Sequence, residues 1–352
     1  MKNFVLKNVR VSDEYTDVVV RDGVVASIGK TSEAGRDCGG ARLVGGLLDI
    51  HTHGNMGHDV MKDDLADMSR FLFKQGVTSW LPSTDAAPIK EIKRVTEVLP
   101  VAEEGMASVP GFHMEGPYIS PNMCGAMDPD GILIPNAEEL AAIKNVKMIT
   151  LAPELPGARD IIANTEAVVC LGHTEADYDI ATEAFALGAK CLTHTFNAML
   201  PLHHRKPGMV GAAFDARAYA QVICDGIHIH PSVIRILYRL FGADRLILIS
   251  DAICAAGLSD GEYSFSGGMH FFVKDGMARL ADGTLAGSTV TLMDCVQRAI
   301  SFGIPPMDAY RMASETPATM LGLKKGKVAV GYDAEFLLLD DDYKLLEVIA
   351  AR

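Results

Sequence analysis

Short apolar runs alternate with longer amphipathic runs through most of the chain. The apolar runs have the length and composition of buried strands. They cover residues 47–54, 78–84, 109–116, 146–153, 168–174, 191–197, 219–225 and 246–251. Helical patterns lie between or after them, at residues 65–75, 89–99, 137–143, 178–187, 232–241, 290–302 and 307–321. Eight strand–helix units over roughly 250 residues are typical of a closed barrel, so we predict an α/β fold of the (β/α)8 TIM-like type.

The two ends of the chain carry a different pattern. Residues 4–9, 17–20 and 24–28 are short β-type runs, with a turn at Arg21-Asp22-Gly23 between the last two. Similar runs return at residues 328–330 and 336–340. We therefore predict one small β-sandwich domain built from residues 1–45 and 326–352, beside a hydrolase barrel of residues 46–325.

Composition limits the partners of the protein. A formal net charge of −13 argues against binding to nucleic acid or to an anionic membrane surface, so any anionic ligand needs a local basic patch. The seven cysteines are scattered and form no C-x-x-C pair, which indicates reduced thiols in a cytoplasmic protein. No apolar run approaches the ~18 residues of a membrane span, so we expect a soluble protein.

Histidines and carboxylates stand where the predicted strands end. His51 and His53 end the first strand two residues apart, so both rings project from the same face. The other strand-end residues are Glu115 on the third, His173 on the fifth, His194 on the sixth and Asp251 on the eighth. Catalytic groups of a (β/α)8 barrel gather at this end. One such residue alone can serve backbone groups, but six on one rim indicate a metal centre.

Nitrogen and oxygen ligands without cysteine suit Zn or Fe in a hydrolytic site with one position left open for water. Such a metal polarises a carbonyl and lowers the pKa of bound water towards ~7. Asp251 is the natural general base, because a carboxylate beside that water can take its proton and return it to a leaving amine. This transfer is typically worth about 10²- to 10⁴-fold in rate. A purely structural ligand is the alternative role for Asp251.

Several segments together carry a family resemblance. They are L-D-I-H-T-H-G, G-F-H-M-E-G-P-Y, L-G-H-T, T-H-T-F-N-A-M, R-K-P-G-M-V-G-A, D-G-I-H, S-D-A and G-T-L-A-G-S-T. In order and spacing, over about residues 43–330, they resemble the N-acetylglucosamine-6-phosphate deacetylases of the amidohydrolase superfamily. The resemblance implies a metal-dependent barrel with a flanking β-sandwich, usually a homodimer. It also implies hydrolysis of N-acetylglucosamine 6-phosphate to glucosamine 6-phosphate and acetate in amino-sugar catabolism.

The resemblance also assigns roles to the strand-end residues. A principal metal would be held by Glu115, His173 and His194, with Asp251 as catalytic acid/base. In members that keep the H-x-H motif a second metal can bind, so His51 and His53 allow one or two ions per subunit, with Glu115 a candidate bridge. The identity of the metal and the number of ions stay open.

The substrate side is implied in the same way. Its positions are Ala126, Met127, Asn197, Ala198, Arg205, His228, Leu285, Ala286 and Gly287. Asn197 and Ala198 correspond to contacts with the sugar phosphate, Arg205 and His228 to a phosphate grip, and residues 285–287 to a loop lining the sugar. In the family such Arg and His residues reach into the neighbouring subunit's site, so a homodimer would complete the pocket. Without the resemblance, residues 203–206 read as an exposed basic loop.

Two positions depart from the family pattern. Met127 stands where some deacetylases have a histidine that polarises the substrate carbonyl, and a thioether cannot donate that hydrogen bond. Gly45 replaces a common proline, which we expect only to loosen the turn.

The alternatives to the leading function are a deacetylase of N-acetylgalactosamine 6-phosphate or of another N-acylated amine, and a non-catalytic barrel that serves as an assembly subunit.

Overall fold

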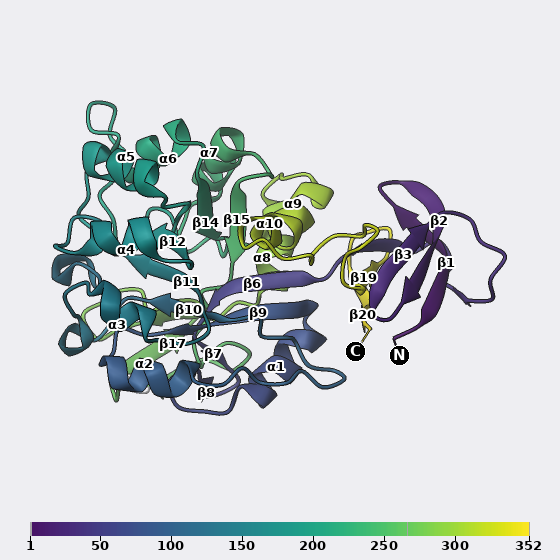
Figure 1. Cartoon of the computed structure of the whole chain (residues 1–352), viewed down its shortest axis with the longest axis horizontal. Coiled ribbons are helices and arrows are strands. Elements are labelled where there is room, and N and C mark those ends of the chain that lie inside the picture. Colours follow the sequence, from purple (N-terminus) through teal and green to yellow (C-terminus); the bar gives the residue numbers. More distant parts are fainter. Residues whose placement is uncertain (1, 266, 352) are drawn as a thin grey trace.

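The computed structural model describes residues 2–265 and 267–351. Eight parallel strands form one sheet in the order β15-β14-β13-β12-β11-β10-β9-β6 (Figure 1). Their bounds are β6 (Leu47–Thr52), β9 (Val77–Thr84), β10 (Phe112–Glu115), β11 (Val146–Leu151), β12 (Val168–Leu171), β13 (Cys191–Leu192), β14 (Tyr219–Ile223) and β15 (Leu246–Ile249). The Asp251 amide donates to the His51 carbonyl at 2.9 Å, and the His53 amide donates to the Ala252 carbonyl at 2.7 Å. These bonds join the last strand to the first, and the predicted TIM-like barrel is confirmed.

The helices surround this sheet. They are α1 (Leu65–Lys74), α2 (Ile89–Thr96), α3 (Ala137–Ala141), α4 (Ala158–Asn164), α5 (Tyr178–Leu187), α6 (Gly208–Asp215), α7 (Pro231–Phe241), α8 (Leu292–Ser301), α9 (Pro306–Met312) and α10 (Glu315–Met320). The last two replace the single helix predicted at residues 307–321, because Ser314 leaves the helical region with φ −138° and ψ −80°. Helices α4 and α6 were not predicted. The first has only seven residues, and the second is rich in glycine and alanine, which gives a weak amphipathic signal.

An apolar cluster fills the barrel interior beneath its carboxyl end. Buried side chains such as Ile50, Leu81 and Ile223 meet there. Helix α10 contributes Ala318 and Met320 to the same cluster, so it closes the amino end of the barrel. This packing excludes water from one end and leaves the strand-end residues as the floor of an open site at the other.

The small β domain draws on both chain ends. Its sheet has seven strands, ordered β20-β19-β5-β1-β2-β3 with β4 added to β1. The bounds are β1 (Phe4–Val11), β2 (Glu14–Arg21), β3 (Val24–Ile28), β4 (Arg36–Asp37), β5 (Arg42–Gly45), β19 (Glu335–Leu339) and β20 (Leu345–Ala350). Strand β19 pairs antiparallel with β5, and the two termini lie side by side (Figure 1). The prediction of one β domain from both ends is confirmed. Residues 328–330 form no strand. The exact boundaries at 45/46 and 325/326 stay a prediction.

Gly45 does more than loosen a turn. A Cβ built at this position would lie 2.1 Å from the carbonyl carbon of Gly326 and 2.5 Å from the amide nitrogen of Lys327. The backbone at Gly45 and the backbone of residues 326–327 therefore lie too close together to leave room for a Cβ atom at position 45. This corrects the expectation for Gly45, because the glycine is required where the two domain connections pass each other.

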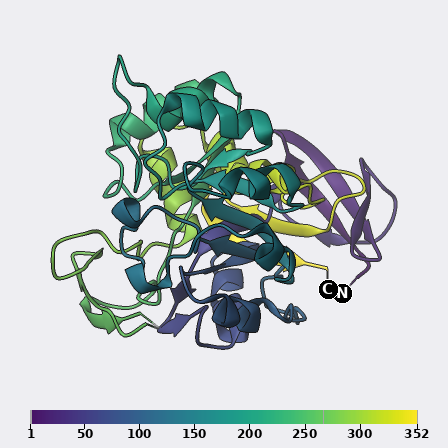
Figure 2. The ribbon, with the colours of Figure 1, turned by 60° about the vertical axis from the view of Figure 1, so that its left-hand side comes forward.

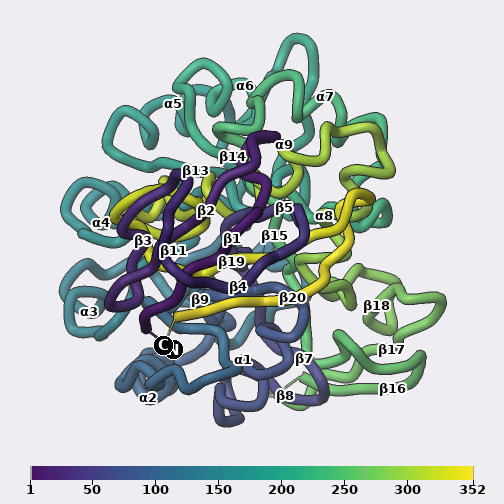
Figure 3. The backbone as a smooth tube through the Cα atoms, turned by 90° about the vertical axis from the view of Figure 1, so that its right-hand side faces the viewer, coloured from purple at the N-terminus to yellow at the C-terminus, as the bar shows by residue number. Residues whose placement is uncertain are grey.

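Smaller elements border the open end of the barrel. They are β7 (Gly54–Asn55), β8 (His58–Asp59), the 3-10 helices η1 (Pro121–Met123) and η2 (Pro129–Gly131), and the strands β16 (Gly261–Ser264), β17 (His270–Lys274) and β18 (Met277–Arg279). Figure 2 shows the last three as green strands standing out from the barrel, and Figure 3 labels them beside β7 and β8. The sequence pattern did not predict this three-stranded sheet.

The seven cysteines are free in the structure, and their expected reduced state stays a prediction. Within residues 2–265 and 267–351 there is no helix with the length and apolar character of a membrane span. The cytoplasmic location stays a prediction.

Candidate metal centre and active site

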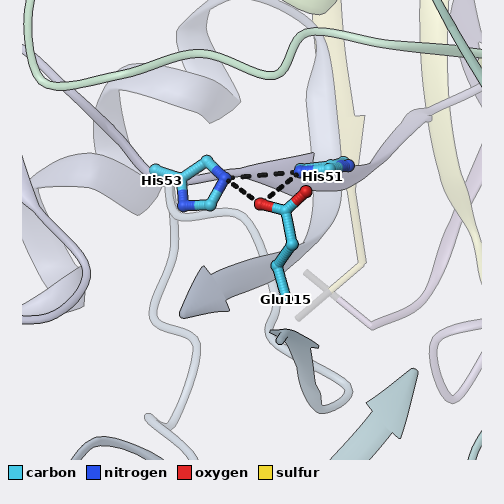
Figure 4. Close-up of side chains that lie close together, drawn as sticks. All are labelled: His51, His53 and Glu115. Atoms are coloured by element: carbon cyan, nitrogen blue, oxygen red, sulfur yellow. Dashed lines mark hydrogen bonds and ion pairs between the residues drawn. The ribbon is translucent and has the colours of Figure 1, made fainter. Parts of the chain in front are cut away.

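The Glu115 carboxylate lies between two pairs of histidines at the carboxyl end of the barrel. Its Oε2 is 3.2 Å from His51 Nε2 and 2.9 Å from His53 Nε2 (Figure 4). Its Oε1 is 3.2 Å from His173 Nε2 and 3.1 Å from His194 Nε2. Each oxygen thus completes a cluster of three donor atoms that lie within 4.8 Å of one another. The structure brings together two candidate metal clusters that share one carboxylate.

Contacts on the far side of three of the four rings indicate which nitrogen carries the proton, whereas His194 Nδ1 has no hydrogen-bond partner among the described residues. His173 Nδ1 lies 2.8 Å from the Met123 carbonyl oxygen, which only accepts, so Nδ1 is the donor. His51 Nδ1 lies 3.1 Å from Gln221 Oε1, and His53 Nδ1 lies 2.9 Å from Asp85 Oδ1. When neutral, each of these three rings turns an Nε2 lone pair towards the Glu115 oxygens, as a metal ligand must.

Acceptors that face one another in a buried site are stabilised by a cation between them, either a proton on a ring or a metal ion. The donor set of imidazole nitrogens and carboxylate oxygens is that of Zn or Fe rather than of Mg or Ca. The residues present therefore fit a divalent metal, and they fit it at two adjacent positions.

Electrostatics within the cluster follow from burial and from the shared carboxylate. Burial opposes the charge on Glu115, but the nearby His51 and the contacts with His173 and His194 outweigh it and hold the pKa of Glu115 well below its usual range. Burial lowers the pKa of His194. Burial also opposes protonation of His51, yet Glu115 and Asp251 raise its pKa. Glu115 is therefore held in its ionised form, in which a carboxylate serves as a metal ligand.

Asp251 lies at the same centre. Its Oδ1 is 3.3 Å from His51 Nε2 and 3.5 Å from His53 Nε2. The side chain also lines the open cavity, so the carboxylate can face both the metal cluster and a bound molecule. Its backbone adopts φ 48°, and His173 and His194 have φ 50° and 25°. Positive φ at three non-glycine residues is costly, and its concentration at strand ends of one rim is typical of a functional site.

A cavity of about 1090 Å³ opens over this centre. Of the predicted substrate positions, those that line it are Ala126, Met127, Asn197, Ala198, His228, Leu285, Ala286 and Gly287. Arg205 does not line it, and its guanidinium lies in the exposed loop 200–207, 2.6 Å from His204 Nε2. His228 lines the cavity of its own chain, where its Nδ1 is 2.6 Å from Asp225 Oδ2. A role of Arg205 and His228 in a neighbouring subunit's site stays a prediction.

Met127 has a defined place at the cavity wall. Its sulfur accepts the Ala86 amide at 3.4 Å. The side chain therefore ties the segment after η1 to the end of β9 and presents no hydrogen-bond donor to the cavity. Met127 therefore offers no hydrogen bond to a substrate carbonyl from this position.

Two residues that orient the histidines were not singled out from the sequence. Asp85 directly follows the second predicted strand, so the strand-end rule that found Glu115 would also have found it. Gln221 sits within β14 and gives no such signal, because its role depends on the distance to His51 across the barrel. His113 fills the barrel interior, with Nδ1 2.9 Å from Ser83 Oγ and Nε2 2.8 Å from Thr150 Oγ1.

Comparison with known proteins agrees with this geometry. A model of the amidohydrolase family matches residues 42–351. The chain belongs to the amidohydrolase family. Among curated family members it is 35% identical to an N-acetylgalactosamine-6-phosphate deacetylase of Escherichia coli O157:H7, over 94% of this chain and 92% of that protein. It is 34% identical to an N-acetylglucosamine-6-phosphate deacetylase of Lysinibacillus sphaericus, over 100% of this chain and 96% of that protein.

Solved amidohydrolase structures give the same picture. The N-acetylglucosamine-6-phosphate deacetylase of Thermotoga maritima superposes with a TM-score of 0.90 at 32% identity, covering 99% of this chain and 98% of that one. A variant of the Mycobacterium smegmatis enzyme in complex with N-acetyl-D-glucosamine 6-phosphate gives 0.89 at 31% identity, covering 100% and 98%. The family resemblance predicted from the motifs is confirmed, and membership together with the two clusters supports a divalent metal.

Proposed function

We propose that this amidohydrolase hydrolyses the acetamide of N-acetylglucosamine 6-phosphate and releases glucosamine 6-phosphate and acetate. The single observation that carries the proposal is the pair of clusters sharing Glu115, with Asp251 beside them at the floor of an open cavity. The curated relatives that cover most of this chain are deacetylases of hexosamine 6-phosphates. A non-catalytic barrel would have no use for the complete ligand set.

The chain's own residues divide the chemistry between them. A divalent ion held by Glu115 and the histidines would polarise the amide carbonyl and make water a better nucleophile. Asp251 takes a proton from the attacking water as its oxygen bonds to the carbonyl carbon. The same carboxyl then returns the proton to the amide nitrogen as the carbon–nitrogen bond breaks, which lets the nitrogen leave as an amine.

We infer two ions per subunit, zinc or iron, because each Glu115 oxygen has its own pair of histidines. Metal analysis of the purified protein tests this count. Two equivalents are expected in the wild type, and one equivalent is expected in His53→Ala. A wild type that binds one equivalent even with excess metal would contradict the two-ion site.

The sugar is the less determined part of the proposal. N-acetylgalactosamine 6-phosphate is the second candidate, because relatives of both names are similarly identical to this chain. The two sugars differ at a single hydroxyl, so kcat/KM measured for each decides between them. Unphosphorylated N-acetylglucosamine is the third arm. Equal kcat/KM for the phosphorylated and the unphosphorylated sugar would contradict recognition of the phosphate by Arg205 and His228.

We further propose a homodimer in which Arg205 grips the phosphate in the neighbouring site, because its guanidinium lies outside its own cavity. Arg205→Ala should raise KM for the phosphorylated sugar. Mixing Arg205→Ala with Asp251→Asn subunits provides the sharper test. In a mixed dimer, one site would combine an intact Asp251 with an intact Arg205, so activity should reappear. If the mixture remains as inactive as the separate variants after subunit exchange, Arg205 does not serve the neighbouring active site.

A further inference from the structure

A second cavity, of about 480 Å³, lies at the opposite end of the barrel from the metal centre. Tyr219, the first residue of β14, and Arg245, just before β15, form part of its wall. Helices α9 and α10 provide the facing side with Arg311 and Glu315. Nothing in the deacetylation proposed above uses this cavity.

Positive charge is concentrated in this cavity. Arg217, Arg245 and Arg311 line it, although the chain as a whole carries a net charge of −13. Two carboxylates also line it, but both are engaged by Arg311: Nη1 lies 2.7 Å from Asp244 Oδ1, and Nε lies 3.7 Å from Glu315 Oε2. In the described part of the chain, no carboxylate lies within ion-pair distance of Arg217 or Arg245.

One nitrogen of the Arg245 guanidinium lacks an acceptor. Its Nη1 is buried and has no hydrogen-bond partner among the described residues. Burial and the nearby positive charge of Arg217 lower the pKa of Arg245, and the neighbouring Asp244 carboxylate offsets part of this effect. A buried donor on a charged group is expensive to leave unpaired, and a second arginine close by adds to that cost.

Support of a helix end accounts for only part of this arrangement. Arg245 Nη2 donates to the Leu240 carbonyl at 3.1 Å, and the guanidinium carbon lies 5.5 Å from the Phe241 ring centroid. These contacts stabilise the end of α7. They leave Nη1 unused and give no role to Arg217, which ends the turn after α6 with φ 54°.

We propose that Arg217 and Arg245 form a binding site for a phosphate group at the amino end of the barrel, with Arg311 and its carboxylates as the facing wall. Guanidinium groups are the preferred partners of phosphate, because their planar donors match its oxygens. A phosphate group in this cavity places negative charge between two like charges. The occupant is a small phosphate, either inorganic phosphate or a phosphate monoester.

Binding and direct location test the site on the intact enzyme. Calorimetric titration with inorganic phosphate, and separately with glucose 6-phosphate, should show a binding event in the wild type. Arg217→Ala and Arg245→Ala should weaken it about 10- to 100-fold, the usual effect of losing a charge-assisted hydrogen bond. Any binding that is unchanged in both variants reports the catalytic cavity. Arg239→Ala, which removes an exposed arginine of α7 outside both cavities, is the charge-matched control.

The two phosphate sources give different patterns. If the variants weaken only the binding of glucose 6-phosphate, the site is specific for a phosphate monoester. If they weaken the binding of both glucose 6-phosphate and inorganic phosphate, the site recognises the phosphate group itself. Crystals soaked in selenate should show an anomalous peak between Arg217 and Arg245. Phosphate affinities equal in wild type and both variants, together with no peak in this cavity, would overturn the proposal and leave the arginines as helix-end supports.

Discussion

Replacement of Asp251 by asparagine separates proton transfer from metal binding. The change keeps the size of the side chain and removes its ability to take a proton. The cluster of Glu115, His173 and His194 contains no atom of Asp251, so its three donors remain. The hydrogen bond from the Asp251 amide to the His51 carbonyl, which connects the last barrel strand to the first, also remains.

The expected magnitude follows from the role. Transfer of a proton by a positioned group is worth about 10²- to 10⁴-fold, so kcat should fall by that factor. At 1.36 kcal/mol for each factor of ten, this is roughly 2.7 to 5.4 kcal/mol of barrier. KM should change little, because the proton moves in the transition state and contributes nothing to ground-state binding.

Steady-state acetate release and metal analysis of the same sample form the assay. Asp130→Asn is the control, since Asp130 lines the same cavity but is exposed and belongs to neither cluster. A kcat for Asp251→Asn close to that of the wild type, with metal fully retained, would refute the acid/base role. Loss of metal in this variant would assign Asp251 the structural ligand role instead.

Four further outcomes are expected. Glu115→Gln leaves an oxygen for only one cluster, so metal analysis should find at most one ion per subunit. Asp85→Ala removes the carboxylate beside His53, a member of the cluster with His51 and Glu115. Calorimetry should show that the ion in this cluster binds about 10- to 100-fold more weakly. An unchanged metal affinity would contradict the orienting role of Asp85. Gly45→Ala places a Cβ 2.1 Å from the Gly326 carbonyl carbon and should cost about 1 to 3 kcal/mol in urea unfolding, unlike Gly261→Ala, where the nearest atom is 3.5 Å away. Acidification through about pH 6 should release metal and activity together, because histidine ligands bind as neutral rings, and activity that persists well below that pH would count against the ligand set.

The sequence by itself determined the barrel and the residues on its rim. Burial imposes a local pattern on every strand, and the carboxyl ends of parallel strands meet at one edge. Therefore the positions of His51, Glu115, His173, His194 and Asp251 along the chain were enough to predict that they converge. The union of the two chain ends in one β domain followed from the same kind of local pattern.

Only the tertiary structure decided which of these side chains contact one another at the site. That each Glu115 oxygen serves a different pair of histidines depends on side-chain rotamers, which no spacing encodes. The contact of Gln221 with His51 joins residues 170 positions apart, and the close approach at Gly45 joins segments from opposite chain ends. The position of Arg205 outside the cavity of its own chain likewise depends on the placement of its loop. Local periodicity reports only whether a residue is buried, whereas the partners it meets are fixed by the packing of distant elements.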